Sequence, residues 1–277
     1  AHGSASQAVE YAIEYWEANG IVTLTWHWNA PEKYLKEIWY KGFYTDQTTI
    51  DLENIMSGYD TEGYRLLVED IDAIAVQLKR LQDAGVPVLW RPLHEAGGGW
   101  FWWGAAGSEA YIQLYRMMYD RLTNYHGLDN LIWVWNGQDA EWYPGDDVVD
   151  IIGEDTYPGE QVYTPQTARF MQATKYTSAN KIIIMSENGC LFDPDLAVRD
   201  GAMWGLFCTW GGEFVVKSDA FNALSEQYTE EYMVQKVYAH EAVVTRADLP
   251  DLKTYPLPET AGEAEAQAQA EAETRAT

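Results

Sequence analysis

The sequence has few cysteines and few basic residues, and both shortages narrow the classes of protein it can encode. Only Cys190 and Cys208 are cysteines among 277 residues, too few for a disulfide framework. We expect two free thiols, with a single disulfide as the alternative. Lysine and arginine total 18 against 43 acidic residues, which makes the net charge −25. This balance disfavours nucleic acid, anionic membranes and acidic substrates as partners, and it suits a neutral or cationic polymer.

Several other signals are missing. No apolar run is long enough to span a bilayer, and residues 1–19 do not resemble a signal peptide. No G-x-G-x-x-G turn marks a dinucleotide site. The segment H-E-A-G-G at position 94 lacks the second histidine of the H-E-x-x-H zinc motif. We therefore expect neither a metal nor a cofactor.

Aromatic side chains, in contrast, are plentiful. The chain has 13 tryptophans and 19 tyrosines, and 47% of its residues are hydrophobic. A chain of this size and composition can bury a large core, to which most of these rings should belong. The flat, partly polar faces of the remaining tryptophans and tyrosines suit the faces of sugar rings.

Short apolar runs alternate with amphipathic segments along the chain. The runs predict strands at 21–28, 86–93, 131–135, 150–154, 182–185 and 204–209, and the amphipathic segments predict helices at 8–18, 61–84, 108–125 and 225–244, with a short one starting at 193–194. The connection at 29–60 is rich in aromatics and predicts a structured loop over a site. Alternating strands and helices indicate a parallel sheet, either an α/β barrel or a doubly wound sheet. Polar residues follow several of the strands, which favours the barrel.

Two glutamates occupy the most informative positions. Glu95 follows the strand in V-L-W-R-P-L-H-E-A-G-G-G-W-F-W-W-G, and Glu187 ends the strand in I-I-I-M-S-E-N-G. The carboxyl ends of barrel strands meet on one face, so the two carboxylates can point at one substrate bond. Glycosidases need such a pair, one as the acid and one as the nucleophile or base. The plainer interpretation is that either glutamate is a hydrogen-bonded strand-end group without catalytic function.

The sequence around these positions resembles glycoside hydrolase family 26. The segment W-R-P-L-H-E-A-G-G-G-W-F-W-W-G is similar to the motif of the family's fourth strand, W-H-W-N-A-P to its third, I-I-G-E-D-T-Y-P to its sixth and S-E-N-G to its seventh. The resemblance covers residues 8–255 and implies a (β/α)8 TIM barrel that acts outside the cell, secreted or at the cell surface. It implies a retaining endo-β-1,4-mannanase whose partner is a β-mannan polysaccharide or oligosaccharide. A β-1,3-1,4-glucanase or β-1,3-xylanase is the alternative within the family.

The resemblance also assigns roles to individual residues. Glu95 becomes the general acid/base and Glu187 the nucleophile, which His94 and Tyr157 would hydrogen-bond. Trp210 becomes the stacking platform under the reacting sugar. The remaining candidates are sugar contacts at His27, Trp100 and Trp103, and supporting residues at Asn136 and Asp155.

The chain departs from the family at its start. We expect six strands, corresponding to the family's third to eighth, with the first two absent from this chain. Six strands cannot close the same barrel, so a missing N-terminal segment or another chain would complete it. We place the barrel domain at 1–258 and a low-complexity Glu/Ala/Gln tail at 259–277. An incomplete barrel also leaves open a non-catalytic carbohydrate-binding relic.

Overall fold

A computed structural model describes residues 6–217 and 220–256. The chain divides into two compact units, 1–243 and 244–277. The second contains one described element, the 3-10 helix η9 (Arg246–Asp248), which Thr245 and Asp248 close with a capping box. The predicted tail at 259–277 lies outside the described residues. No described helix combines the length and the apolar character that a membrane crossing requires.

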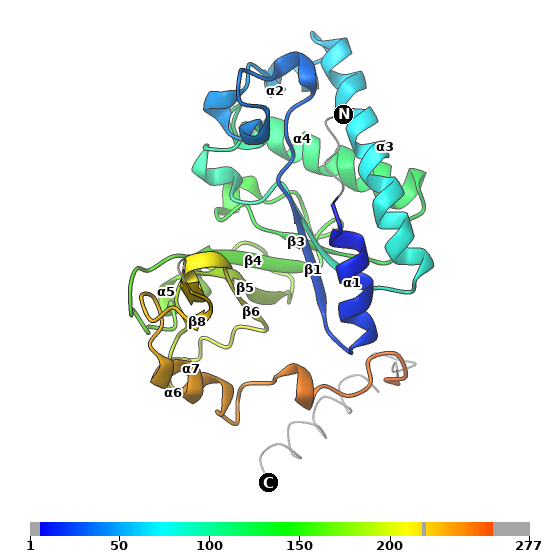
Figure 1. Cartoon of the computed structure of the whole chain (residues 1–277). Helices are drawn as coiled ribbons and strands as arrows, with labels where there is room; N and C mark the ends of the chain where they lie inside the picture. Colours follow the sequence, from blue (N-terminus) through cyan, green and yellow to red (C-terminus); the bar gives the residue numbers. More distant parts are fainter. Residues whose placement is uncertain (1–5, 218–219, 257–277) are drawn as a thin grey trace. The chain divides into compact units, whose positions relative to one another are not determined.

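The first unit is built on six parallel strands in the order in which they occur along the chain (Figure 1). The strands are β1 (Val22–Trp26), β2 (Val88–Pro92), β3 (Leu131–Trp135), β4 (Ile151–Thr156), β5 (Ile182–Asn188) and β6 (Phe207–Thr209). Within the described residues β1 and β6 are the sheet's two edges. The predicted six strands and their parallel, partial-barrel arrangement are confirmed. Completion of the barrel by a further segment or a second chain stays a prediction.

α-Helices connect most of the strands, whereas the connection from β3 to β4 contains only a short 3-10 turn, η7 (Ala140–Trp142). The α-helices are α1 (Ala8–Glu17), α2 (Leu52–Met56), α3 (Thr61–Asp83), α4 (Ser108–Tyr119), α5 (Thr167–Ala173), α6 (Pro194–Asp200) and α7 (Glu231–Tyr238). Short helical turns are η1 (Glu32–Tyr34), η2 (Trp39–Lys41), η3 (Thr45–Gln47), η4 (Ala96–Gly98), η5 (Trp102–Gly104), η7 (Ala140–Trp142) and η8 (Gly212–Phe214), and the π-helix η6 (Asp120–Tyr125) continues α4. In Figure 1, α1 runs beside β1 and α5 lies next to β4.

The buried core of the described residues consists of one large apolar cluster and three small ones. Helix α3 buries Leu67, Ile71 and Leu78 on one stripe, and this stripe belongs to the main apolar cluster together with Trp90 and Trp133 of the sheet. On the other face of the sheet a small cluster forms from Leu89, Val134, Ile151 and Ile184. Alternate strand residues share a face, so Leu89 and Arg91 lie on the same side of β2. The small cluster is therefore the apolar floor beneath the strand ends.

Several predicted boundaries shift for physical reasons. The predicted helix at 225–244 shortens at both ends to α7, because Ser225 still bonds through its N–H to Val215 O beside the antiparallel pair β7 (Val216–Lys217) and β8 (Ala220–Leu224), residues 226–228 form a turn, and the helix ends at Tyr238. Helix α3 begins at Thr61 as expected, and Asp60 caps it, since its carboxylate accepts the backbone N–H of Gly63 at 2.8 Å. Helix α4 begins at Ser108 as expected but ends at Tyr119, where the π-helix η6 continues it to Tyr125. The strand expected at 204–209 begins only at Phe207.

Two other expectations are confirmed. The connection at 29–60 is structured, and its Tyr44 pairs in an antiparallel bridge with Phe101 of the loop that follows β2. Both cysteines are free, with Cys190 buried and Cys208 partly buried.

Candidate active site

The carboxyl ends of the strands surround one pocket with a volume of about 460 Å³. Side chains that follow different strands line it: His27, His94, Glu95, Trp100, Phe101, Gln138, Asp155, Tyr157, Arg169, Glu187 and Trp210. Ten site residues are predicted from the sequence, and eight of them line this pocket. The other two, Trp103 and Asn136, are fully buried and do not line the pocket.

The backbone of Glu95 has an unusual conformation. Its φ angle is +54°, in the left-handed region, and two residues earlier Leu93 has φ +52°. Non-glycine residues rarely adopt this region, and they concentrate at functional sites where surrounding contacts hold them. Asn136 supplies such contacts, because its backbone oxygen and its Oδ1 accept the Glu95 N–H at 2.7 and 3.2 Å. The turn aims the Glu95 side chain into the pocket.

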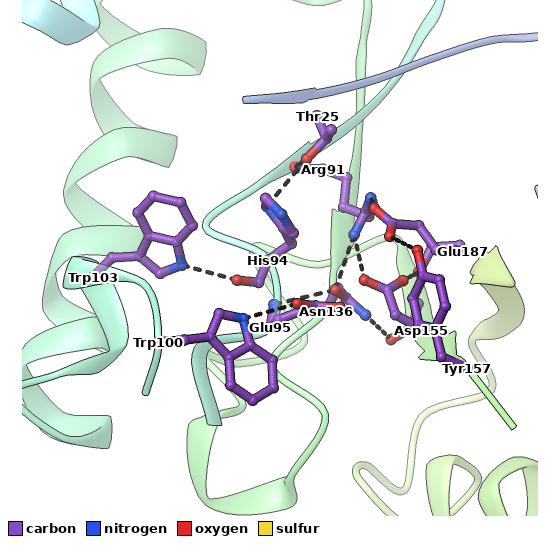
Figure 2. Close-up of polar contacts among 12 residues, drawn as sticks. Thr25, Arg91, His94, Glu95, Trp100, Trp103, Asn136, Asp155, Tyr157 and Glu187 are labelled. Atoms are coloured by element: carbon purple, nitrogen blue, oxygen red, sulfur yellow. Dashed lines mark hydrogen bonds and ion pairs between the residues drawn. The ribbon is translucent and has the colours of Figure 1, made fainter. Parts of the chain in front are cut away.

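The carboxyl group of Glu95 sits in a half-buried setting that favours its protonated form. Burial raises its pKa, and the nearby negative charge of Glu187 raises it further. Hydrogen bonding with Asp155 and from the indole N–H of Trp100, which lies 3.0 Å from Oε2, opposes the rise. Figure 2 shows the Trp100 indole pointing at this carboxyl group.

Glu187 is held from two sides. The hydroxyl of Tyr157 donates to Oε2 at 2.6 Å, and the guanidinium of Arg91 donates to Oε1 (Figure 2). Burial and the charge of Asp155 raise the pKa of Glu187, while the Arg91 charge and both hydrogen bonds lower it. The expected hydrogen bond from Tyr157 is therefore present, and Arg91 supplies the second donor.

Arg91 links the site into one network. It is 4% exposed, and its Nη1 donates to Asp155 Oδ2 at 2.8 Å and to Asn136 Oδ1 at 3.0 Å. Burial raises the pKa of Asp155 to about 7, although the Arg91 charge opposes this rise. Asp155 also accepts the hydroxyl of Ser186 at 2.6 Å, and Asn136 donates to Gly153 O at 2.8 Å. Asp155 and Asn136 thus have the contacts expected of supporting residues.

His94 lies in the pocket but differs from its expected partner. Its Nδ1 lies 3.2 Å from the hydroxyl of Thr25, and no contact among the described residues joins it to Glu187. Burial, together with the charge of Arg91, lowers the pKa of His94 to about 2, so the ring is neutral. Trp103 donates its indole N–H to the backbone oxygen of His94 at 2.9 Å. Trp103 therefore supports His94 and does not reach the pocket, which corrects its prediction as a sugar contact.

Aromatic rings form one wall of the pocket. The His27 ring lies 4.7 Å from the ring of His94, 5.9 Å from Phe101 and 6.3 Å from Trp210. Trp210 is 39% exposed and Trp100 is 48% exposed, so both present indole surface to solvent. Rings placed in this way suit the apolar faces of a sugar.

Three carboxylates come close enough together to hold a cation. One oxygen from each of Glu95, Asp155 and Glu187 lies within 4.8 Å of the others, and within the described part of the chain this trio is the one group with that property. Arg91 contacts two of the three carboxylates and already supplies positive charge to them. The expectation that the site needs no metal stays a prediction.

Sequence reasoning missed four residues of the site. Arg91 stands alone as a charge in the apolar run V-L-W-R-P-L, and a fully buried arginine demands buried partners, so this signal could have identified it. Phe101 belongs to the aromatic segment W-F-W-W that follows Glu95 in the sequence. Gln138 and Arg169 belong to no recognisable motif, and only the fold brings them to the pocket.

Comparison with known proteins agrees with this geometry. A family model described as glycosyl hydrolase family 26 matches residues 1–239. A mannan endo-1,4-beta-mannosidase of Thermothelomyces thermophilus is 46% identical over 237 residues, which cover 84% of this chain and 49% of that protein. Mannan endo-1,4-beta-mannosidase A of a Piromyces species is 36% identical, over 87% of this chain and 38% of that protein. The chain thus spans half or less of the length of these two relatives.

Solved structures are similar as well. A Podospora anserina β-(1,4)-mannanase described as GH26-CBM35 is 44% identical and superposes with a TM-score of 0.81, covering 89% of this chain and 54% of that one. A β-mannanase from a symbiotic protist of the termite Reticulitermes speratus, complexed with a gluco-manno-oligosaccharide, is 35% identical with a TM-score of 0.78. The match covers 88% of this chain and 73% of that one.

Proposed function

Because the chain belongs to glycosyl hydrolase family 26, we propose that it hydrolyses internal β-1,4-mannosidic bonds of mannan, galactomannan or glucomannan. Glu187 is the nucleophile and Glu95 the general acid/base of a double displacement that retains the anomeric configuration. The observation that carries this proposal is the close approach of the two carboxylates at the mouth of the sheet, with oxygens within 4.8 Å of each other.

The carboxylate spacing favours retention. Retaining enzymes place their two carboxyl groups about 5 to 5.5 Å apart, whereas inverting enzymes leave roughly 6.5 to 9.5 Å for a water molecule. One oxygen of Glu95 and one of Glu187 lie within 4.8 Å of each other, which is nearer to the retaining spacing than to the inverting one. A direct attack by Glu187 on the anomeric carbon therefore suits this site better than attack by water.

The contacts of each carboxyl group fit its proposed step. Arg91 and Tyr157 orient Glu187 and stabilise its ionised form, while burial keeps Glu95 protonated to a higher pH than an ordinary glutamate. Glu187 attacks the anomeric carbon as Glu95 gives its proton to the leaving oxygen. Consumption of the Glu187 charge removes one cause of the raised Glu95 pKa. Glu95 then accepts a proton from the water that hydrolyses the glycosyl-enzyme.

Mannan is favoured over the other substrates of the family. Both relatives compared above are named mannan endo-1,4-beta-mannosidases, and the protist enzyme was solved with a gluco-manno-oligosaccharide. Mixed-linkage β-glucan and β-1,3-xylan remain the alternatives, which reducing-sugar assays on the three polymers separate. A carbohydrate-binding relic would bind mannan without turnover. The retained Glu95–Glu187 pair and its full set of supporting contacts argue against a decayed site.

The Glu187→Ala variant tests the proposal. We expect hydrolysis of galactomannan to fall by at least about 10⁴-fold, because the covalent step is lost, while affinity for mannooligosaccharides is kept. Initial rates and calorimetric binding measure the two properties, and NMR of the first product formed by the wild-type protein reports its anomeric configuration. Near-wild-type turnover in Glu187→Ala would refute the assignment, and an inverted first product would refute retention.

The site of action follows from the substrate. A polysaccharide cannot cross a membrane, so we also propose that the protein acts outside the cell, secreted or at the cell surface. Mannanase activity in the culture fluid or on intact cells of the source organism supports this, and activity confined to lysates contradicts it.

A further inference from the structure

Two polar side chains line the pocket in addition to the aromatic rings and the carboxyl groups. Gln138, which follows β3, and Arg169, on α5 after β4, both belong to this lining and have no part in the catalytic steps above. The rings of Trp210 and His27 follow the two edge strands β6 and β1, and those of Trp100 and Phe101 follow β2. Gln138 and Arg169 therefore come from the connections after the middle strands β3 and β4.

The backbone of Gln138 has an unusual conformation that a neighbouring side chain holds in place. Its φ angle is +63°, a left-handed conformation that glutamine rarely adopts. The hydroxyl of Tyr176, itself 7% exposed, donates to the Gln138 carbonyl oxygen at 3.0 Å and anchors the turn. Strained residues of this kind are retained at ligand-binding positions when surrounding contacts hold them.

Arg169 is held by an ion pair with a buried carboxylate. Its Nη1 lies 3.4 Å from Oε2 of Glu154, a carboxylate whose side chain is fully buried, while 44% of the arginine side chain is exposed. Glu154 Oε1 has no hydrogen-bond partner among the described residues. One long contact leaves most of the five guanidinium N–H donors of Arg169 available to a ligand.

We propose that Gln138 and Arg169 form the subsite that binds the sugar on the leaving-group side of the scissile bond. This inference rests on the proposed function. A sugar stacked on Trp210 with its anomeric carbon toward Glu187 directs its leaving oxygen to Glu95, and the next sugar then meets the polar lining residues Gln138 and Arg169. The hydroxyls of a neutral mannosyl unit offer both donors and acceptors. They match the amide of Gln138, which does both, and the donor fork of Arg169.

A comparison of two substrates isolates this subsite. β-1,4-Mannopentaose fills both sides of the scissile bond, whereas an aryl β-mannotrioside presents a nitrophenyl group in place of the leaving sugar. We expect Arg169→Ala and Gln138→Gly each to lower kcat/KM for mannopentaose about tenfold more than for the aryl substrate, the size expected for a lost hydrogen bond from a charged or amide group. Gln138→Gly suits its left-handed backbone, so this loss is not a folding defect.

Further variants separate positioning from general damage. Tyr176→Phe deletes the hydroxyl that anchors Gln138 and that also interacts with Glu154, the partner of Arg169. We expect the same substrate preference to shift, by a smaller factor. Arg65→Ala removes an arginine that pairs with Glu62 and Glu69 on the surface of α3 and should change neither substrate's kcat/KM.

The outcomes distinguish the two proposals. A selective loss on mannopentaose supports the subsite. If the wild-type protein cleaves both substrates and the Arg169 and Gln138 variants lose neither or lose both equally, the subsite inference is overturned and the proposed function stands. If the wild-type protein cleaves neither substrate, the proposed function fails and the inference fails with it.

Discussion

Several neighbours set the pKa of Glu95, and the hydrogen bond from Trp100 is the one that a single substitution can remove. The indole N–H of Trp100 lies 3.0 Å from Glu95 Oε2 and stabilises the ionised carboxylate, which lowers the Glu95 pKa against the larger effect of burial. This donor can be deleted while an aromatic ring is kept at the position, so its contribution is measurable.

Trp100→Phe should therefore raise the pKa of Glu95. The protonated acid then persists to higher pH, so the alkaline limb of the pH profile of kcat/KM moves to higher pH. Profiles on an aryl mannoside measure the shift. Trp16→Phe, on α1 outside the pocket, should leave the limb where it is. An alkaline limb that stays fixed or moves to lower pH in Trp100→Phe contradicts this account of the Glu95 environment.

Sequence reasoning reached part of this site and missed the rest. Glu95 and Glu187 were predictable as pocket residues because each ends a strong strand, and strand ends of one sheet meet. Asn136 and Asp155 followed from the same rule. The partner of Glu187 did not, because the hydrogen bond that Arg91 makes joins β2 to β5, 96 residues apart. Gln138 and Arg169 occupy loop and helix positions whose place at the pocket depends on chain geometry that no local pattern encodes.

At the scale of elements, the loop after β2 has no room for a side chain at Gly104. A Cβ added to Gly104 in η5 would collide with the backbone oxygen of Ala96 in η4, the residue that directly follows Glu95. The two short helices pack through this contact, and no flexible side chain is there to move aside. The position of Glu95 is thus coupled to a glycine nine residues away.

Gly104→Ala should displace the loop and with it the acid/base. We expect kcat/KM to fall at least about a hundredfold, since small misplacements of a catalytic group are costly, with a lower Tm as well. Gly58→Ala gives the control, because an added Cβ there meets nothing within 4 Å and only its φ of +84° is strained. That control should lose about 1 kcal/mol of stability and no activity. Full activity in Gly104→Ala would show that the loop adapts.

The elements themselves were largely predictable. The alternation of apolar runs with amphipathic helices identified all six strands of the main sheet, because a parallel sheet covered by helices requires that pattern. The helix expected at 225–244 was wrong at both ends. Its helical periodicity is real from Glu231 to Tyr238. The residues before it follow directly on β8, and the bond from Ser225 N–H to Val215 O is a contact that hydrophobic spacing does not reveal.

For the whole molecule, charge and buried carboxyl groups affect stability in the same direction. The net charge of −25 causes self-repulsion at neutral pH. Burial raises the pKa of Glu154 from 4.5 to about 7, and that of Asp155 from 3.8 to about 7. The folded protein therefore keeps protons that the unfolded chain has lost. Glu154 and Asp155 therefore contribute to stability in full below the pKa values of the unfolded chain, and this contribution is lost as the pH rises through about 7.

We accordingly expect a higher Tm near about pH 5 than near about pH 8, and a Tm at the higher pH that increases with added salt. Differential scanning calorimetry measures both effects. Glu154→Gln removes one of the titrating groups, so it should narrow the difference in Tm between the two pH values. A Tm that is equal or higher at about pH 8 would contradict the raised pKa values.

The Arg91 network has a consequence for recombination between relatives. One guanidinium serves Asp155 on β4 and Glu187 on β5, and the same nitrogen that reaches Asp155 reaches Asn136 after β3. A chimaera that takes β2 from one parent and β3 to β5 from another inherits a working site only if both parents carry the same four residues. The helices and outer loops are not bound in this way. Crossovers are thus best placed before β2 or after β5, so that the four positions pass on as a single block.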